Sequence, residues 1–367
     1  MSLTRRLDEF QRRHRWAGFP IGVVYKFGED QGVFLAALIT YYGFLSLFPL
    51  FLLLASALGF ILQGNPDLQR QILDSALSQF PVIGDELGEP QGLQGNVGAL
   101  VVGGIVAVYG AIGVAQAMQN AMNVAWAVPR NHRLNPLRAR LRSLHLIAIG
   151  GAAVLATTIL SGLGSSAGAF GSDLGGASTV LVIVLAMAIN IAVFIQVFRI
   201  CTAEGVPVRD VVPGAVTAAI FWQLLQLFGT AYVGNVVKGA GATYGVFALV
   251  LGLFAWIFLA AVGVVISAEI NVVRSRHLYP RALMTPFTDN VDLTAADRRA
   301  YTDAAQAQRF KGFESVTVRY ADDGQQASAR RRARDDAAPP AIPGDPPAGS
   351  ETTEAETTAT ETTAPRN

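Results

Sequence analysis

The sequence is poor in the residues on which many soluble proteins and enzymes depend. Cys201 is the only cysteine, which excludes an intrachain disulfide framework and a cysteine metal cluster. Charged residues make up 15% of the chain, against about 25% in typical soluble domains, and hydrophobic residues make up 51%. This composition is typical of an integral membrane protein. The net charge of +1 gives no support to nucleic-acid binding.

Recognisable catalytic motifs are also absent from the sequence. It contains no Gly-x-x-x-x-Gly-Lys-Ser/Thr phosphate loop, no His-Glu-x-x-His and no Gly-x-Ser-x-Gly. The four histidines are far apart and lack the spacing of metal ligands. We therefore expect no enzyme activity, no cofactor and no metal site, and we do not expect ATP-driven transport by this chain alone.

Long apolar stretches dominate what is present. A bilayer core is roughly 30 Å thick, so about 20 apolar residues suffice for a helix to cross it. Six stretches meet this length: Val33–Leu62, Val97–Met122, Leu144–Leu163, Ala177–Phe198, Val211–Val233 and Gly245–Ile270. The sequence predicts an all-α, polytopic membrane protein with six transmembrane helices. Pro49 lies inside the first stretch, where we expect a break or kink of the helix.

Basic residues predict the orientation of these helices. Lysine and arginine in short loops stay on the cytoplasmic side, and here their bias between the two sides is roughly eightfold. The basic segments precede the first stretch, lie between the second and third and between the fourth and fifth, and follow the sixth. Both termini are therefore predicted to be cytoplasmic.

Four regions follow from this topology. Residues 1–30 form a basic amphipathic segment that we expect along the inner membrane surface, although a solvated leader is an alternative. Residues 31–278 form the six-helix domain, and its loop Gln63–Asn96 is predicted to carry a short external amphipathic helix. Residues 279–321 are a partly helical juxtamembrane segment, in which Thr294 and Asp297 resemble a capped helix start. Residues 322–367 are predicted to be a disordered cytoplasmic tail.

Polar residues within the predicted spans are the candidates for a substrate pathway, because buried polar groups in a membrane are costly and face the bundle or water. Most of them fall toward the predicted cytoplasmic side, which predicts a polar cavity in that half of the bundle. The alternative is that the amides only tie helices together. The candidates are Tyr41, Gln116, Gln119, Asn120, Asn123, Asn190, Gln196, Gln223, Glu269 and Asn271.

Glu269 is the only carboxylate within or at the edge of a predicted span. Arg199 and Arg209 are predicted at similar depth on the same side, so we expect a buried ion pair between Glu269 and one of them. Such a pair could serve as a structural clamp or as a gate.

Several runs of residues resemble one known family. They are Ala36 to Leu50, Trp126 to Arg138, Val208 to Ala215, Tyr244-Gly245, Trp256 and Ala268 to Asn271, and the likeness extends over approximately Gly18–Leu278. In this order and spacing they resemble the BrkB/YihY family of inner-membrane proteins, formerly labelled ribonuclease BN. The resemblance implies a six-helix protein of the bacterial cytoplasmic membrane, associated with serum resistance and with movement of lipids or lipid-linked molecules. The nuclease label is not carried over, because the spans and short loops offer no clustered metal ligands.

Taken together, these features predict a transport-related protein, such as a conduit or flippase-like helper for a lipid or other amphiphile. Membrane lipids are then its expected partners. A non-catalytic scaffold or regulator that acts through the basic arm and the cytoplasmic tail, with protein partners of the tail, is the alternative.

Overall fold

The computed structural model describes residues 3–61, 97–167, 175–232, 242–288 and 291–320. The chain divides into two units, Met1–Val318 and Arg319–Asn367, and nearly all of the second lies outside the described residues. The described part of the first unit is helical and contains no strand. Its elements are α1 (Leu3–Arg13), α2 (Arg15–Glu29), α3 (Gly32–Ile61), α6 (Val97–Ala125), η1 (Arg130–His132), α7 (Pro136–Ala167), α8 (Gly175–Cys201), α9 (Val208–Tyr232), α10 (Ala242–Ser275) and α11 (Ala295–Gln306).

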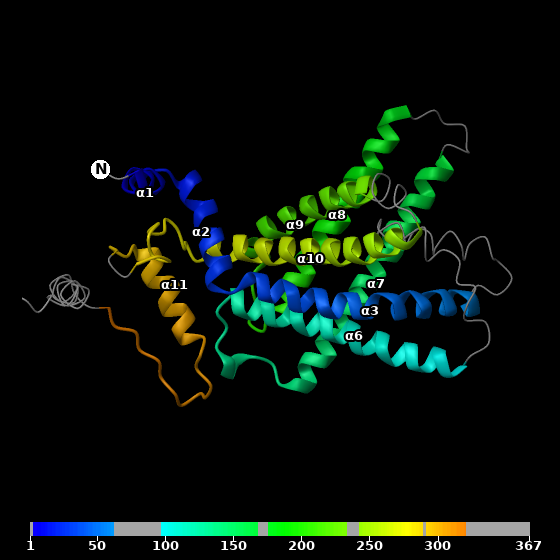
Figure 1. Ribbon diagram of the computed structural model, residues 1–367, viewed down its shortest axis with the longest axis horizontal. Coiled ribbons are helices and arrows are strands. Elements are labelled where there is room, and N and C mark those ends of the chain that lie inside the picture. The colour runs from blue at the N-terminus through cyan, green and yellow to red at the C-terminus, as the bar shows by residue number, and fades with distance from the viewer. Residues whose placement is uncertain (1–2, 62–96, 168–174, 233–241, 289–290, 321–367) are drawn as a thin grey trace, which may run out of the picture. The chain divides into compact units, whose positions relative to one another are not determined.

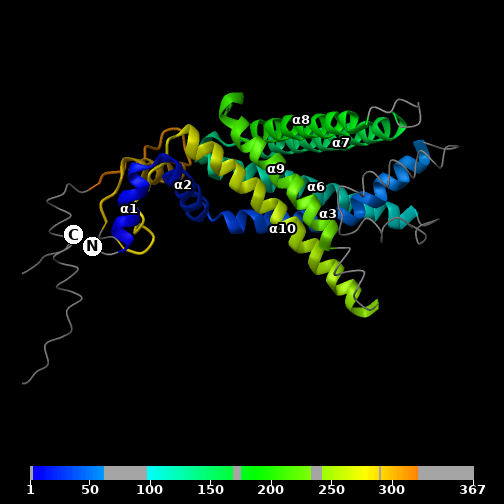
Figure 2. The ribbon, with the colours of Figure 1, turned by 90° about the horizontal axis from the view of Figure 1, so that it is seen from above.

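Six long helices form a bundle, and small residues let them approach closely. In Figure 1, α3 lies beside α6, and Figure 2 shows α7 running along α8. A Cβ added at Gly110 of α6 would lie 2.5 Å from the Cβ of Ser46 on α3, so this contact requires a glycine. Gly214 plays the same part on α9, because its Cβ would lie 2.1 Å from the Ser267 oxygen of α10. These contacts fix the α3–α6 and α9–α10 pairs.

Four of the described helices are long and apolar enough to cross a membrane. The qualifying segments are Gly104–Ala125, Val184–Cys201, Val208–Gly229 and Val250–Ser275. The first and third predicted spans correspond to α3 and α7, and the side chains in the C-terminal parts of these two helices are not described. Within its described part, α3 contributes the shorter apolar stretch Gly32–Leu47. Membrane-spanning helices are thus found, whereas six spans and the orientation of the termini stay predictions.

The first long helix, α3, is continuous from Gly32 to Ile61 and includes Pro49. A helix can bend at a proline without ending, so the kink expected at Pro49 stays a prediction. The helix α7 begins at Pro136, ahead of the predicted span, so the basic stretch Arg138–Arg142 is helical. Pro136 suits the first helical position because it lacks an N–H, and the side chain of Asn135 accepts a hydrogen bond from the Arg138 N–H at 2.9 Å. The predicted external helix within Gln63–Asn96 lies outside the described residues.

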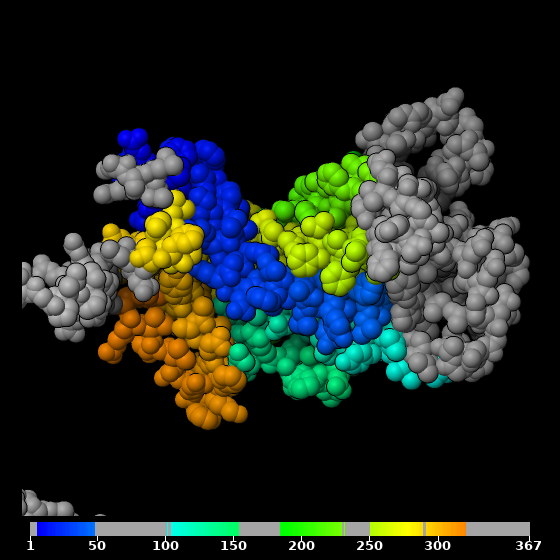
Figure 3. Space-filling view, in the orientation of Figure 1, coloured from blue at the N-terminus to red at the C-terminus, as the bar shows by residue number. Residues whose placement is uncertain are grey.

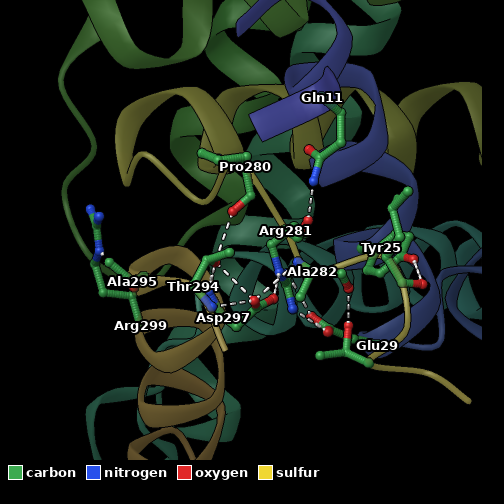
Figure 4. A network of polar contacts seen from close by, with 12 residues as sticks. Gln11, Tyr25, Glu29, Pro280, Arg281, Ala282, Thr294, Ala295, Asp297 and Arg299 are labelled. Carbon is green, nitrogen blue, oxygen red and sulfur yellow. Dashed lines mark hydrogen bonds and ion pairs between the residues drawn. The ribbon is translucent and has the colours of Figure 1, made fainter. Parts of the chain in front are cut away.

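Described segments from near both ends of the first unit pack together, as Figure 3 shows, in a terminal module, which we define as α1, α2, residues 276–288 and 291–294, and α11. Its centre is the fully buried side chain of Arg281, drawn in Figure 4. The Arg281 Nε donates to Asp297 Oδ1 at 2.5 Å, and its Nη atoms pair with the Glu29 carboxylate. Burial by itself would lower the pKa of Arg281, but hydrogen bonds and charges from Glu29 and Asp297 outweigh it and raise the pKa.

Further contacts in the module join α1 and α2 to the segment that follows α10. Gln11 donates to the backbone oxygen of Arg281, and the Tyr25 hydroxyl donates to that of Leu283 at 2.6 Å. The helix α11 begins at the predicted cap: Thr294 and Asp297 form a complete capping box. The basic N-terminal segment therefore contacts protein as two helices, while its place along a membrane surface stays a prediction.

We expect the change Asp297→Ala to destabilise the terminal module by about 3 kcal/mol, because it removes both the cap of α11 and one carboxylate of a buried arginine. Hydrogen exchange of residues 278–306 should become faster, while exchange in the bundle should change little. The control Glu204→Ala removes a carboxylate that is half exposed and pairs with His132 at 3.2 Å. Equal exchange in the two variants would contradict the central place of Arg281 in the module.

Candidate functional site

The amide residues of α6 line a polar hollow, which lies between the C-terminal half of α6, the loop that follows it and the first turns of α7. Its volume is about 270 Å³. The hollow is lined by Gln116, Gln119, Asn120, Asn123, Arg133, Leu134, Pro136, Ala139 and Arg140. Gln116, Gln119, Asn120 and Asn123 thus border one polar space from the same face of α6.

Two of these amides also join neighbouring helices. Gln119 is buried, and its Nε2 donates to Ser143 Oγ at 3.0 Å and to the Ala139 oxygen at 3.2 Å, both on α7. Asn123 Oδ1 accepts the N–H of Ala203, just beyond α8, at 2.8 Å. The alternative role, in which amides tie helices together, is therefore present in the same residues that line the hollow.

The arginines near this hollow differ in their partners. Arg133 donates from Nε to the Val128 oxygen at 3.2 Å and from Nη1 to Asn120 Oδ1 at 3.3 Å. Burial lowers the pKa of Arg133, and the positive charge of Arg130 lowers it further. Arg142 lies outside the hollow and donates to the backbone oxygens of Ile200 and Thr202 at 3.1 and 2.8 Å, so it satisfies carbonyls at the end of α8. Both arginines belong to the basic stretch between the second and third predicted spans, which indicated the orientation but not these contacts.

A second space, the apolar cavity, lies within the bundle and has a volume of about 420 Å³. All six long helices contribute to its wall. Among the lining residues are Ser46, Met118, Gly150, Asn190, Trp222 and Trp256. Ser46 and Asn190 are the polar side chains in this wall, and the rings of Trp222 and Trp256 meet edge to face at 5.3 Å. Asn190 is the one predicted pathway residue that lies here.

The two spaces lie on different faces of α6. Successive residues of a helix are turned by about 100°, which places Val114 and Met118 on one side and Gln116 and Asn120 on the other. The first pair lines the apolar cavity and the second pair lines the polar hollow. Neither space contains all the predicted pathway residues, and Asn190 is separated from the amides of α6. The polar cavity in the cytoplasmic half stays a prediction.

The remaining candidates lie in neither space. Tyr41, Gln196 and Gln223 are exposed on the surface of the described bundle. Asn271 is buried, and its Oδ1 accepts the Gly214 N–H at 2.6 Å, which strengthens the α9–α10 contact. The position of Asn271 thus matches the helix-tying role.

Glu269 has a different charged partner from the expected one. Its Oε2 lies 3.8 Å from Nζ of Lys26 on α2, and Lys26 also pairs with Asp30. Arg199 instead donates to the Val206 oxygen at 3.3 Å, and Arg209 is 86% exposed and lies 3.7 Å from Asp210. The predicted pairing of Glu269 with Arg199 or Arg209 is wrong, because the terminal module brings α2 against the end of α10. The available signal was a single lysine within the otherwise apolar run Ile21–Phe27.

Lys26, Asp30 and Glu269 form a buried charge cluster of one ammonium and two carboxyl groups. The Glu269 carboxyl is fully buried, and neither of its oxygens accepts a hydrogen bond from a described residue. Burial by itself lowers the pKa of Lys26, but the carboxylates of Glu269 and Asp30 outweigh it and raise the pKa. Burial raises the pKa of Asp30, and Lys26 offsets only part of this rise.

Comparison with known proteins places this architecture in a family. Residues 23–289 match the family described as "Virulence factor BrkB". The chain belongs to the BrkB family. The matched segment contains both cavities, the buried charge cluster and Arg281, but it ends before α11.

Two curated proteins illustrate the range of this BrkB relationship. The chain is 25% identical over 248 residues to the "Putative ribonuclease-like protein YfkH" of Bacillus subtilis (strain 168), which covers 66% of the chain and 89% of that protein. It is 24% identical over 294 residues to a UPF0761 membrane protein of Psychrobacter sp. (strain PRwf-1), where the alignment covers 76% of the chain but only 53% of the relative. No solved structure matches.

The ribonuclease part of the first relative's name is a historical label, and we do not carry it to this chain. The description of the matched family names no catalytic activity. Within the described residues, no group of three or more His, Cys, Asp or Glu side chains is placed to hold a metal ion.

We expect Lys26→Met to lower the free energy of unfolding by about 3 kcal/mol, because it leaves two buried carboxyl groups without their cation. Thermal unfolding of the full chain in a neutral detergent measures the change. Lys311→Met removes an exposed lysine and serves as the control. A melting temperature equal to that of the control would show that the buried charge cluster contributes little to stability.

The raised pKa of Asp30 predicts a pH dependence of stability. A carboxyl whose folded-state pKa exceeds its unfolded value contributes stability at low pH and loses it as the pH rises through the folded pKa. From about pH 4 upward, Asp30→Asn should therefore become progressively more stable relative to the unchanged chain. Unfolding curves at several pH values check this. A stability difference that does not vary with pH would contradict it.

Proposed function

We propose that this BrkB-family protein is a conduit or flippase-like helper that takes a lipid or similar amphiphile from the bacterial cytoplasmic membrane. The apolar cavity is the observation that carries the proposal. Its volume of about 420 Å³ falls within the range of about 300–1,000 Å³ that small-molecule pockets occupy. Its wall is mainly apolar, which suits an acyl or prenyl chain.

The chemistry of the wall also matches an amphiphile. Trp222 and Trp256 supply broad apolar surface, and Trp256 Nε1 donates to the Leu225 oxygen at 3.3 Å, so its polar group is satisfied outside the ligand space. Asn190 and Ser46 provide polar groups at which a head group or linkage can be oriented. A few polar groups in an apolar wall are typical of ligand pockets.

The proposal includes a topology. With six spans and both termini in the cytoplasm, the polar hollow and the buried charge cluster both belong to the cytoplasmic half, because they lie next to the basic loop and the end of α10. The sequence carries no nucleotide-binding motif, so the movement we propose is passive or coupled to a gradient.

A scaffold or regulator is the second candidate function, and one observation favours it. The described part of the terminal module exposes large aromatic side chains, among them Trp16 and Phe287. Exposed aromatic groups of this kind suit contact with a partner protein. Deletion of residues 322–367 separates the two candidates, since a scaffold that acts through its tail loses function and a conduit keeps it.

We expect Gly150→Phe to reduce the lipid that co-purifies with the protein, because the new ring enters the apolar cavity. Gly151→Phe is a matched control: a Cβ at either glycine meets nothing within 4 Å, but only Gly150 lines the cavity. Native mass spectrometry of both variants, purified gently and at equal protein yield, measures bound lipid. Equal lipid content in the two variants would contradict the proposal.

A further inference from the structure

The polar hollow contains positive charge that no carboxylate among the described residues neutralises. Arg133 is half buried, yet its hydrogen bonds within the described chain go to the neutral oxygens of Val128 and Asn120. The contrast with other arginines is clear, because Arg276 pairs with Asp303 at 2.8 Å and Arg281 with two carboxylates. Arg140, which lines the same hollow, has no ion pair within the described part of the chain. A partly desolvated cation without an anion is an unfavourable arrangement unless a ligand supplies the charge.

Two amides of the hollow keep donors that have no described acceptor. The Ala203 N–H and the Arg133 guanidinium can only donate, so they must bond to the oxygens of Asn123 and Asn120 respectively. The Nδ2 groups of both residues, and Arg133 Nη2, bond to no described acceptor. The residues that line the hollow thus carry several such donors, and no carboxylate is among them.

The start of α7 adds positive potential to the hollow. Pro136 and Ala139 lie in the wall of the hollow, so the N-terminal turn of a long helix borders it. The aligned peptide dipoles place partial positive charge at that end. The volume of about 270 Å³ is several times the roughly 30 Å³ that one water occupies, so there is room for a tetrahedral oxyanion with its waters.

We propose that the polar hollow is a binding site for a phosphate group, held by Arg133, Arg140 and the amides of Asn120 and Asn123. Free phosphate and the head group of a membrane phospholipid both carry this chemistry. The lipid source rests on the function proposed above, whereas the phosphate site itself does not. Since the hollow and the apolar cavity lie on different faces of α6, the phosphate-site proposal and the lipid proposal can be refuted independently of each other.

Titration calorimetry on the full chain in a non-ionic detergent tests the site. The probes are inorganic phosphate and a short-chain phosphatidic acid, with acetate as the comparison anion. Arg133→Gln should weaken binding by about tenfold or more, as expected for loss of a charge-assisted hydrogen bond. Arg138→Gln should change it by less than about twofold, because Arg138 is exposed on the same helix as Arg140 but does not line the hollow and is screened by salt.

A comparison of the two phosphate probes identifies the source of the phosphate, and two further variants show whether a loss of binding comes from misfolding. Binding of both phosphate probes supports a general phosphate site, and binding of phosphatidic acid alone supports a lipid head group. Arg140→Gln removes an exposed arginine that makes no hydrogen bond or ion pair with the described residues, so it should weaken binding by about threefold while the melting temperature stays the same. Gly150→Phe should leave phosphate binding unchanged. The proposal is overturned if neither phosphate probe binds, if acetate binds as tightly, or if Arg133→Gln and Arg140→Gln both bind as well as the unchanged chain.

Discussion

Ion pairs made by α2 join the terminal module to the helix bundle. Lys26 faces Glu269 near the end of α10, and Glu29, less than one turn further along α2, pairs with Arg281. Lys26, Glu269 and Arg281 are buried, and each is costly to bury alone, so the helices must meet closely enough for the charges to compensate one another. The position of α2, and through Gln11 that of α1, follows from this requirement.

Polar side chains within the bundle bond to neighbouring segments and also line a polar space, and α6 shows both roles. Gln119 and Asn123 use some of their hydrogen-bonding groups to hold α7 and the segment after α8. The same side chains border the polar hollow with their remaining groups. The opposite face of α6 contributes Val114 and Met118 to an apolar wall. One helix thus separates a space suited to charge from a space suited to hydrocarbon, which is a useful arrangement for a protein that handles amphiphiles.

Local sequence patterns predicted much of this structure. The helical class follows from long apolar runs, and the start of α11 follows from Thr294 and Asp297, because a capping box involves residues only three apart. The shared face of Gln116, Gln119, Asn120 and Asn123 follows from helical periodicity alone. The partner of Glu269 was predicted incorrectly for the opposite reason, since Lys26 lies more than two hundred residues away and is brought close by the fold.

Composition and residue spacing within single segments were enough to predict the membrane-protein class, the family and the helical faces. Which polar groups meet depends on the packing of the helices. That packing separates Asn190 from the amides of α6 and leaves Tyr41, Gln196 and Gln223 on the surface. It also half buries Arg133 without a carboxylate partner among the described residues. The physical reason is that burial and charge compensation depend on how helices cross, and the crossing is set by close contacts such as those at Gly110 and Gly214.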